Sequence, residues 1–317
     1  MKWIVSHQSA LEFWRKSYVK AVAGTRTTMK PPVLPRGTKE LKAVNFWGLM
    51  PPLHVLVGAG SARKVCRGLR CHVNSCEHPG GSFLRMASGM VVSSQELCFM
   101  QMAHELSLVE LVALGYELCG SYRLGSAPDQ GFRADLPLTS VSGLGSYAAK
   151  AVGMRGRVNA QRALRYIADG SASPMETILA MLLTLPYSLG GYGFPRPQLN
   201  YCVVTPAGAS AGKAAGDSKY YCDLYWPDAK VDVEYDSDAY HTGSDRIAKD
   251  AIRRNALIRA GVTVISVSRI QINSAPELRE LAKLLSKLLG KRLQFDPREF
   301  AYRHAKLMTQ LLPKGFC

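Results

Sequence analysis

The sequence predicts an α/β protein: a mixed β-sheet flanked by helices, preceded by a small mixed α/β domain. Three observations predict this fold class. Hydrophobic residues make up 47% of the 317 residues, a share typical of packed globular domains. Short stretches rich in β-branched and aromatic residues alternate with longer amphipathic stretches, the order that produces layered α/β folds. Capping residues and glycines stand where several of these stretches begin or end.

The first half of the chain predicts a small mixed domain. A helical pattern near the N-terminus cannot continue through Pro31, Pro32 and Pro35. Short apolar stretches then predict strands, and they lead into a long helical stretch. The expected elements are a helix at 9–19, strands at 54–57, 69–73 and 90–92, and a helix at 97–119.

Glycine and proline set the expected domain boundary. They cluster between residues 120 and 156, where they disfavour regular structure. We therefore expect a first domain at 1–125, suited to binding DNA or a partner, a linker at 126–150 and a second domain at 151–317. Small residues at 207–216 suit a flexible hairpin loop.

The second half has a more regular order of elements. Ser173 can cap a helix that has Pro174 at its first position and Glu176 three residues after the cap. Ser244 can cap a later helix, which Gly261 ends. The expected elements are helices at 158–167 and 174–185, strands at 199–204, 220–225 and 230–235, a helix at 244–260, a strand at 262–267, and helices at 275–289 and 297–312.

The charge of the chain predicts a polyanionic partner. Forty Lys and Arg residues against 24 Asp and Glu give a formal net charge of +16, and the excess is shared by both halves of the chain. Because Lys and Arg contacts to phosphates supply most non-specific affinity, nucleic acid is the first partner to consider. The window 223–250 is the exception, with eight acidic and three basic residues.

Membrane and secretory classes are excluded by the hydropathy pattern. No apolar run reaches the roughly 18 residues that a membrane span requires. The apolar run at the N-terminus is too short for a signal peptide. We therefore expect a cytoplasmic protein without membrane contact, in which the eight cysteines are mostly reduced.

The acidic window contains a strand with carboxylates on one face. Side chains of a strand alternate between faces, so Asp232, Glu234 and Asp236 share a face. The preceding strand supplies Asp223, which the intervening turn would bring beside Glu234. Carboxylates on adjacent strands can bridge Mg²⁺, which prefers oxygen ligands. The alternative interpretation is a solvated face of a half-buried hairpin.

Several motifs in the second half resemble one known family in their residues and order. They are SPME at 173–176, PRPQLN at 195–200, DLYWP at 223–227, VEYD at 233–236, His241, Asp250 with Arg253 and Arg254, and GVTVI at 261–265. Over about residues 155–290, this order resembles the very-short-patch-repair-like endonucleases of the PD-(D/E)xK restriction-endonuclease-like superfamily. The resemblance implies a restriction-endonuclease-like fold in which Glu176, Asp223 and Glu234 hold Mg²⁺ for phosphodiester hydrolysis.

The chain departs from the superfamily at the position two residues after Glu234. Asp236 stands where the wider superfamily often has Lys, although the very-short-patch-repair-like branch commonly lacks that Lys as well. His241 is the nearest candidate for the general base, because imidazole accepts a proton near neutral pH. Glu176 has two candidate roles, in the metal site and in the capping box with Ser173.

Basic residues on the expected helix at 244–260 are the candidates for DNA contact. They are Arg246, Arg253 and Arg254. Arg253 and Arg254 follow Asp250 at helical spacing, so ion pairs within the helix are their alternative role.

The first half carries a second resemblance and a cluster of possible zinc ligands. Residues 50–122 resemble the domain that precedes such nuclease modules in relatives of AbiEi-type abortive-infection antitoxins, without their usual winged helix. The cluster lies within 13 residues and comprises Cys66, Cys71, His72, Cys76 and His78. Their spacing does not fit the paired ligands of structural zinc sites.

Two functions from different classes are expected. The first is a DNA endonuclease that depends on Mg²⁺, with Mn²⁺ as a substitute, in which Glu176, Asp223, Glu234, Asp236 and His241 form the catalytic site. The second is a non-catalytic DNA-binding regulator of the toxin–antitoxin kind that keeps the nuclease fold as a scaffold. The intact pair of acidic residues on adjacent strands favours the enzyme, and the missing Lys favours the regulator.

Overall fold

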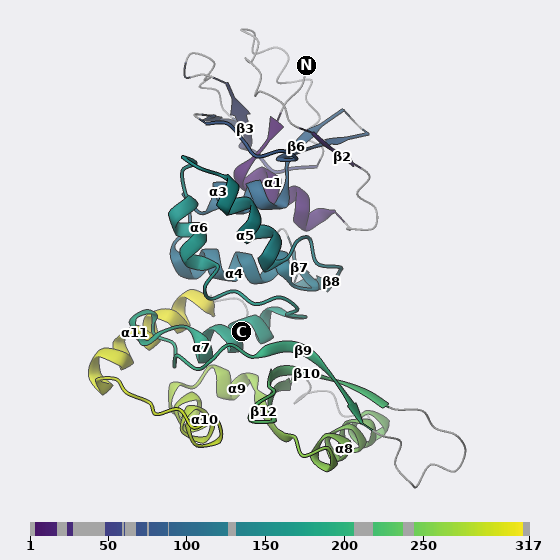
Figure 1. The fold of residues 1–317 in the computed structure, drawn as a ribbon, viewed down its shortest axis with the longest axis vertical. Coiled ribbons are helices and arrows are strands. Elements are labelled where there is room, and N and C mark those ends of the chain that lie inside the picture. The colour runs from purple at the N-terminus through teal and green to yellow at the C-terminus, as the bar shows by residue number, and fades with distance from the viewer. Residues whose placement is uncertain are drawn as a thin grey trace. The chain divides into compact units, whose positions relative to one another are not determined.

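The computed structural model describes residues 4–17, 24–27, 48–58, 60, 68–74, 76–87, 89–125, 131–205, 218–236 and 244–312, with the backbone alone for 244–250. It divides the chain into two compact units, Met1–Ile167 and Ala168–Cys317, here called unit 1 and unit 2 (Figure 1). Each unit is described by itself below.

Unit 1 combines two sheets with helices. Its elements are β1 Ile4–Val5, α1 His7–Lys16, β2 Gly24–Thr27, β3 Leu53–Val57, β4 Leu69–Val73, β5 Phe83–Met86, β6 Val91–Ser93, α3 Gln95–Met102, α4 Leu108–Cys119, β7 Tyr122–Leu124, β8 Phe132–Ala134, α5 Val141–Lys150 and α6 Arg157–Ala163. Six strands form a mixed sheet with the order β2-β5-β6-β1-β3-β4, and β7 pairs with β8. The short strand β1 lies inside the large sheet, parallel to β6 and antiparallel to β3.

The helical stretch expected at 97–119 consists of two helices, α3 and α4. Ser107 begins α4 with a capping box, because its hydroxyl accepts from Glu110 N while the Glu110 carboxylate accepts from Ser107 N. The prediction of one continuous helix was therefore wrong. The turn between the two helices carries His104 and Glu105, and it brings them to the pocket described below.

The structure divides the chain later than the glycine and proline pattern suggested. The expected linker at 126–150 contains β8 and α5, and Ser140 caps α5 by accepting from Gly143 N. Ile167 is fully buried in unit 1 and packs so closely on α4 that a Cβ at Gly115 would lie 2.2 Å from its Cδ1. Unit 1 therefore extends to Ile167.

Unit 2 contains the expected mixed sheet and its helices. Its elements are α7 Pro174–Thr184, the 3₁₀ helix η4 Tyr187–Leu189, β9 Gln198–Thr205, β10 Ser218–Trp226, β11 Val231–Asp236, α8 Ser244–Arg259, β12 Thr263–Ser268, α9 Arg269–Ile272, α10 Ala275–Leu288 and α11 Pro297–Leu311. The strand order is β12-β11-β10-β9, with β11 and β12 parallel and the other pairs antiparallel. The predicted α/β class is confirmed.

Two further expectations concern single segments. The hairpin loop expected at 207–216 lies outside the described residues, between β9 and β10. Among the helices that the structure describes, none has the length and apolar character needed to cross a membrane.

A tight hairpin between β10 and β11 sets the position of the acidic residues. Lys230 closes the turn by donating from its backbone N to Pro227 O at 3.2 Å. The antiparallel register pairs Trp226 with Val231 and Leu224 with Val233. Because Leu224 and Val233 are fully buried, this register is tied to the core of unit 2.

We expect Leu224→Ala to destabilise unit 2 by about 2–5 kcal/mol, because the truncation leaves a cavity at a fully buried position. Urea unfolding of the full chain, followed by circular dichroism, would measure the loss. The matched control is Leu284→Ala on α10, where the side chain is 44% exposed and the change is expected to be small. Equal effects of the two substitutions would contradict this account of the core.

Candidate functional site

Four acidic residues of unit 2 form a carboxylate cluster. Glu176 comes from α7, Asp223 from β10, and Asp232 and Glu234 from β11. Burial, the charge of Glu176 and the charge of Glu234 all raise the pKa of Asp223, so the Asp223 carboxylate lies within electrostatic reach of both glutamates. Three of the four were predicted as metal ligands or catalytic residues, and the fold brings them together.

Asp223 stands where the β10–β11 ladder ends. The last paired residues are Leu224 and Val233, and beyond them the Asp223 carboxylate accepts a hydrogen bond from Tyr235 N at 2.9 Å. Burial, followed by the negative charge of Glu176, raises the pKa of Asp223 to about 7, and Glu234 adds to this effect. The metal-free site therefore holds more negative charge than its surroundings stabilise.

Glu176 lies in the first turn of α7 and is held by neutral donors. Ser173 caps the helix as expected, accepting from Glu176 N at 3.1 Å. The Glu176 carboxylate accepts from Ala172 N and from Asn200 Nδ2, both at 2.8 Å, so it reaches one residue beyond the N-cap of the predicted capping box. Burial raises the pKa of Glu176, and these hydrogen bonds only partly oppose that effect.

Asp232 is the residue of the cluster that the sequence did not single out as a site residue. It is fully buried, opposite Tyr225 on β10, and neither carboxylate oxygen meets a hydrogen-bond donor at good geometry among the described residues. The Cys222 thiol and the Glu234 carboxyl lie beside it. Burial, then the contact with Glu234, raises the pKa of Asp232 well above its usual value.

Glu234 forms an ion pair with Arg253 of α8. The guanidinium contacts both carboxylate oxygens, with N–O distances of 2.6 and 3.0 Å, and it also donates to Tyr221 O. Burial is the largest effect and would lower the pKa of Arg253, but the charge and hydrogen bond of Glu234 together with the charges of Asp223 and Asp232 raise it. One of the arginines predicted to contact DNA thus stands directly at the carboxylate cluster.

The other predicted site residues lie elsewhere or outside the described side chains. Arg254 donates to Ser266 Oγ at 2.5 Å, and Asp236 is exposed at the end of β11. His241 lies outside the described residues, and the side chain of Arg246 is among those not described. Their predicted roles stay predictions.

A second group of possible metal ligands lies in unit 1. One ligand atom each of His7, His72 and Glu105 falls within 4.8 Å of the other two. No other trio of potential ligands converges this closely among the described residues. In the carboxylate cluster, Glu234 is turned to Arg253 and Glu176 to neutral donors, which explains why its oxygens are spread further apart.

No local sequence pattern predicts the group in unit 1. The sequence pattern places His72 only with nearby cysteines and His78, whereas its partners His7 and Glu105 come from distant parts of the chain. No family model, curated protein or solved structure matches this chain.

We expect Asp223→Asn to remove part of the pH dependence of stability in the metal-free protein. Because the pKa of Asp223 is raised from 3.8 to about 7 on folding, the folded state retains a proton that the unfolded chain releases. This contribution to stability is complete below pH 3.8 and is lost as the pH rises through about 7. Thermal unfolding in EDTA across this pH range would measure it.

Asp228→Asn is the matched control for this measurement, because Asp228 is exposed in the turn of the same hairpin. The control is expected to keep the wild-type dependence of the melting temperature on pH. A wild-type dependence in Asp223→Asn would show that Asp223 does not titrate as described.

Proposed function

We propose that the protein is a metal-dependent endonuclease that hydrolyses DNA phosphodiester bonds, with Mg²⁺ or Mn²⁺ held by the carboxylate cluster. The observation that carries the proposal is the convergence of Glu176, Asp223 and Glu234 at the end of the β10–β11 ladder, next to Arg253. Glu176 is buried and Asp223 and Glu234 are half-buried, and three such acidic residues from three elements are poorly compensated without a cation.

The cluster fits a hard divalent cation. All of its members offer oxygen ligands, and the pKa of Asp223 is raised to about 7 by burial and by its acidic neighbours. A cation favours the ionised carboxylate, so its binding would reverse this shift. Bound Mg²⁺ supplies polarisation of the scissile phosphate and a lowered pKa of the attacking water.

The residues at this site would then have separate roles in binding the cation and the phosphate. Asp223 and Glu234 hold the cation, and Glu176 adds negative charge from α7. Arg253 balances the charge of Glu234 in the metal-free protein, and its guanidinium is suited to contact a phosphate once a cation takes over that role. His241 remains the predicted general base, on the sequence argument alone.

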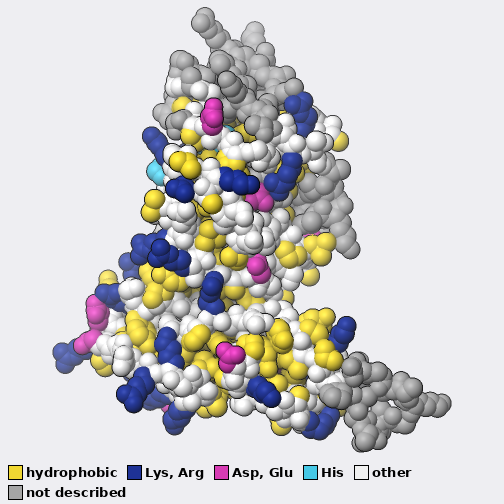
Figure 2. Space-filling view, viewed as in Figure 1, with side chains coloured by type: hydrophobic (Ala, Val, Ile, Leu, Met, Phe, Trp, Pro, Cys, Tyr) yellow, Lys and Arg dark blue, Asp and Glu magenta, His cyan; other side chains and the backbone are white. Residues whose placement is uncertain are grey.

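The charge of the surface supports a polyanionic substrate. Figure 2 shows Lys and Arg side chains spread over the visible face of each unit, with few acidic side chains among them. The formal net charge of +16 agrees with this picture. Such a surface attracts nucleic acid without reading its sequence.

A non-catalytic DNA-binding regulator is the second candidate, and one observation favours it. Glu234 already has a bidentate partner in Arg253, and Glu176 already accepts two hydrogen bonds. A site whose Glu176 and Glu234 carboxylates are held by partners within the protein can serve as a scaffold without turnover. The two functions differ in a single measurable property, the cleavage of DNA in the presence of Mg²⁺.

We expect the wild-type protein to nick supercoiled plasmid DNA in Mg²⁺ and not in EDTA. Asp223→Asn and Glu234→Gln should each lower the cleavage rate about a hundredfold or more, because each removes a charged ligand at nearly unchanged volume. DNA binding by the two variants, measured by fluorescence anisotropy, should persist. Nicking is read from the conversion of supercoiled to open circular plasmid on a gel.

The matched control is Glu280→Gln, an exposed carboxylate on α10 whose side chain is 66% exposed. It should cleave at the wild-type rate. Salt-sensitive DNA binding without nicking in Mg²⁺ or Mn²⁺ would support the regulator. Undiminished nicking by Asp223→Asn and Glu234→Gln would place catalysis outside the carboxylate cluster.

A further inference from the structure

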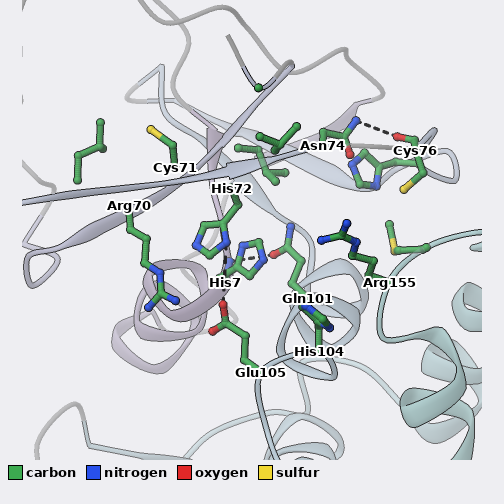
Figure 3. A pocket seen from close by; sticks show the side chains of 16 residues that line it. His7, Arg70, Cys71, His72, Asn74, Cys76, Gln101, His104, Glu105 and Arg155 are labelled. Carbon is green, nitrogen blue, oxygen red and sulfur yellow. Dashed lines mark hydrogen bonds and ion pairs between the residues drawn. The ribbon is translucent and has the colours of Figure 1, made fainter. Parts of the chain in front are cut away.

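Unit 1 contains a histidine-rich pocket of about 780 Å³. Four of the seven histidines of the chain line it, namely His7, His72, His78 and His104, and His54 lies directly against His72. Figure 3 shows His7, His72 and Glu105 pointing toward one another in this pocket. This concentration of imidazoles plays no part in the proposed nuclease chemistry of unit 2.

Three separate elements supply the converging side chains. His7 is the first residue of α1 and is separated from β1 by Ser6 alone, and His72 lies on β4. Glu105 lies in the turn between α3 and α4, which exists because Ser107 starts a new helix. Their ligand atoms lie within 4.8 Å of one another, with His72 Nδ1 3.9 Å from Glu105 Oε1.

Hydrogen bonds orient both imidazole rings. His7 Nδ1 lies 3.0 Å from Ser6 Oγ, so its Nε2 is the nitrogen available to an ion. His72 Nε2 lies 3.1 Å from His54 Nδ1, so its Nδ1 is the nitrogen on the side of Glu105. A histidine ligand whose second nitrogen is held by a neighbouring polar group is a recurring feature of protein metal sites.

We propose that His7, His72 and Glu105 form a site for a divalent first-row transition metal, Zn²⁺ by its ligand set. Two imidazoles and one carboxylate suit Zn²⁺, whereas Mg²⁺ prefers oxygen ligands alone. Three protein ligands leave a fourth position of a tetrahedral ion open, and all three proposed ligands line the pocket. Arg70 and Arg155 line the same pocket, so an anionic ligand suits the open position.

Binding of one ion by both histidines requires the stacked rings of His7 and His72 to turn away from each other. Without an ion, His7 and His72 stack with centroids 3.5 Å apart and an interplanar angle of 13°. Two imidazole nitrogens on one tetrahedral Zn²⁺ are about 3.3 Å apart and their rings diverge from it, given Zn–N bonds of about 2.0–2.1 Å. His72 Nδ1 and Glu105 Oε1 are 3.9 Å apart, so the ligand atoms have to move closer together and the rings have to turn for one ion to be bound.

The test is isothermal titration calorimetry, in which ZnCl₂ is added to the full-length protein after EDTA treatment and dialysis. The buffer contains excess MgCl₂ and a phosphine reductant. The wild-type protein should bind about one Zn²⁺ that Mg²⁺ does not displace. His72→Ala and Glu105→Gln should weaken binding about tenfold or more, and His54→Ala should do so by about tenfold through loss of ring orientation. Glu105 is exposed, so its variant tests the ligand with little risk to folding.

Cys71→Ser is the matched control, because Cys71 lines the same pocket next to His72 and belongs to the cysteine cluster considered from the sequence. It should bind Zn²⁺ like the wild type. The proposal is overturned if the wild type binds no Zn²⁺, if Glu105→Gln and His72→Ala bind it unchanged, or if only Cys71→Ser loses it. The titration contains no DNA, so its outcome is independent of the nuclease assay.

Discussion

The grouping of four buried or half-buried carboxylates, three on the β10–β11 hairpin and one on α7, is the constraint on which the site of unit 2 depends. Removing a charged group from water is costly unless partners replace the lost hydration. Here the partners are the Tyr235 and Ala172 amides, the Asn200 side chain and the Arg253 guanidinium. They compensate incompletely, as the raised pKa of Asp223 shows. A divalent cation is the ligand that would relieve the remaining repulsion.

The two units offer different kinds of ligand atoms for a metal ion. Unit 2 gathers carboxylate oxygens around an arginine, a set suited to a hard cation and a phosphate. Unit 1 gathers imidazoles with a single carboxylate, a set suited to a borderline transition metal. Because Mg²⁺ and Zn²⁺ differ so much in preferred ligands, each site can be examined in the presence of the other ion.

The hairpin and the amphipathic helices were predictable because their signals are local. Each of these signals depends on residues a few positions apart. They are the alternation of side-chain faces along β11, the helix cap at Ser173 and the short turn after Trp226. The two-residue strand β1 and the later unit boundary were not predictable. So short a strand has no measurable periodicity, and packing of Ile167 on α4 places the boundary beyond the glycine-rich region.

The sequence by itself determined the α/β class, the shared strand face of Asp232 and Glu234, and the approach of Asp223 to Glu234, because strand alternation and a tight turn are local properties. Only the tertiary structure decided that Asp232 is fully buried and that Arg253 pairs with Glu234, since both depend on how the rest of unit 2 packs around β10 and β11. The tertiary structure alone also brings His7, His72 and Glu105 together. Residues so far apart in the chain become neighbours only through the sheet order and the break between α3 and α4.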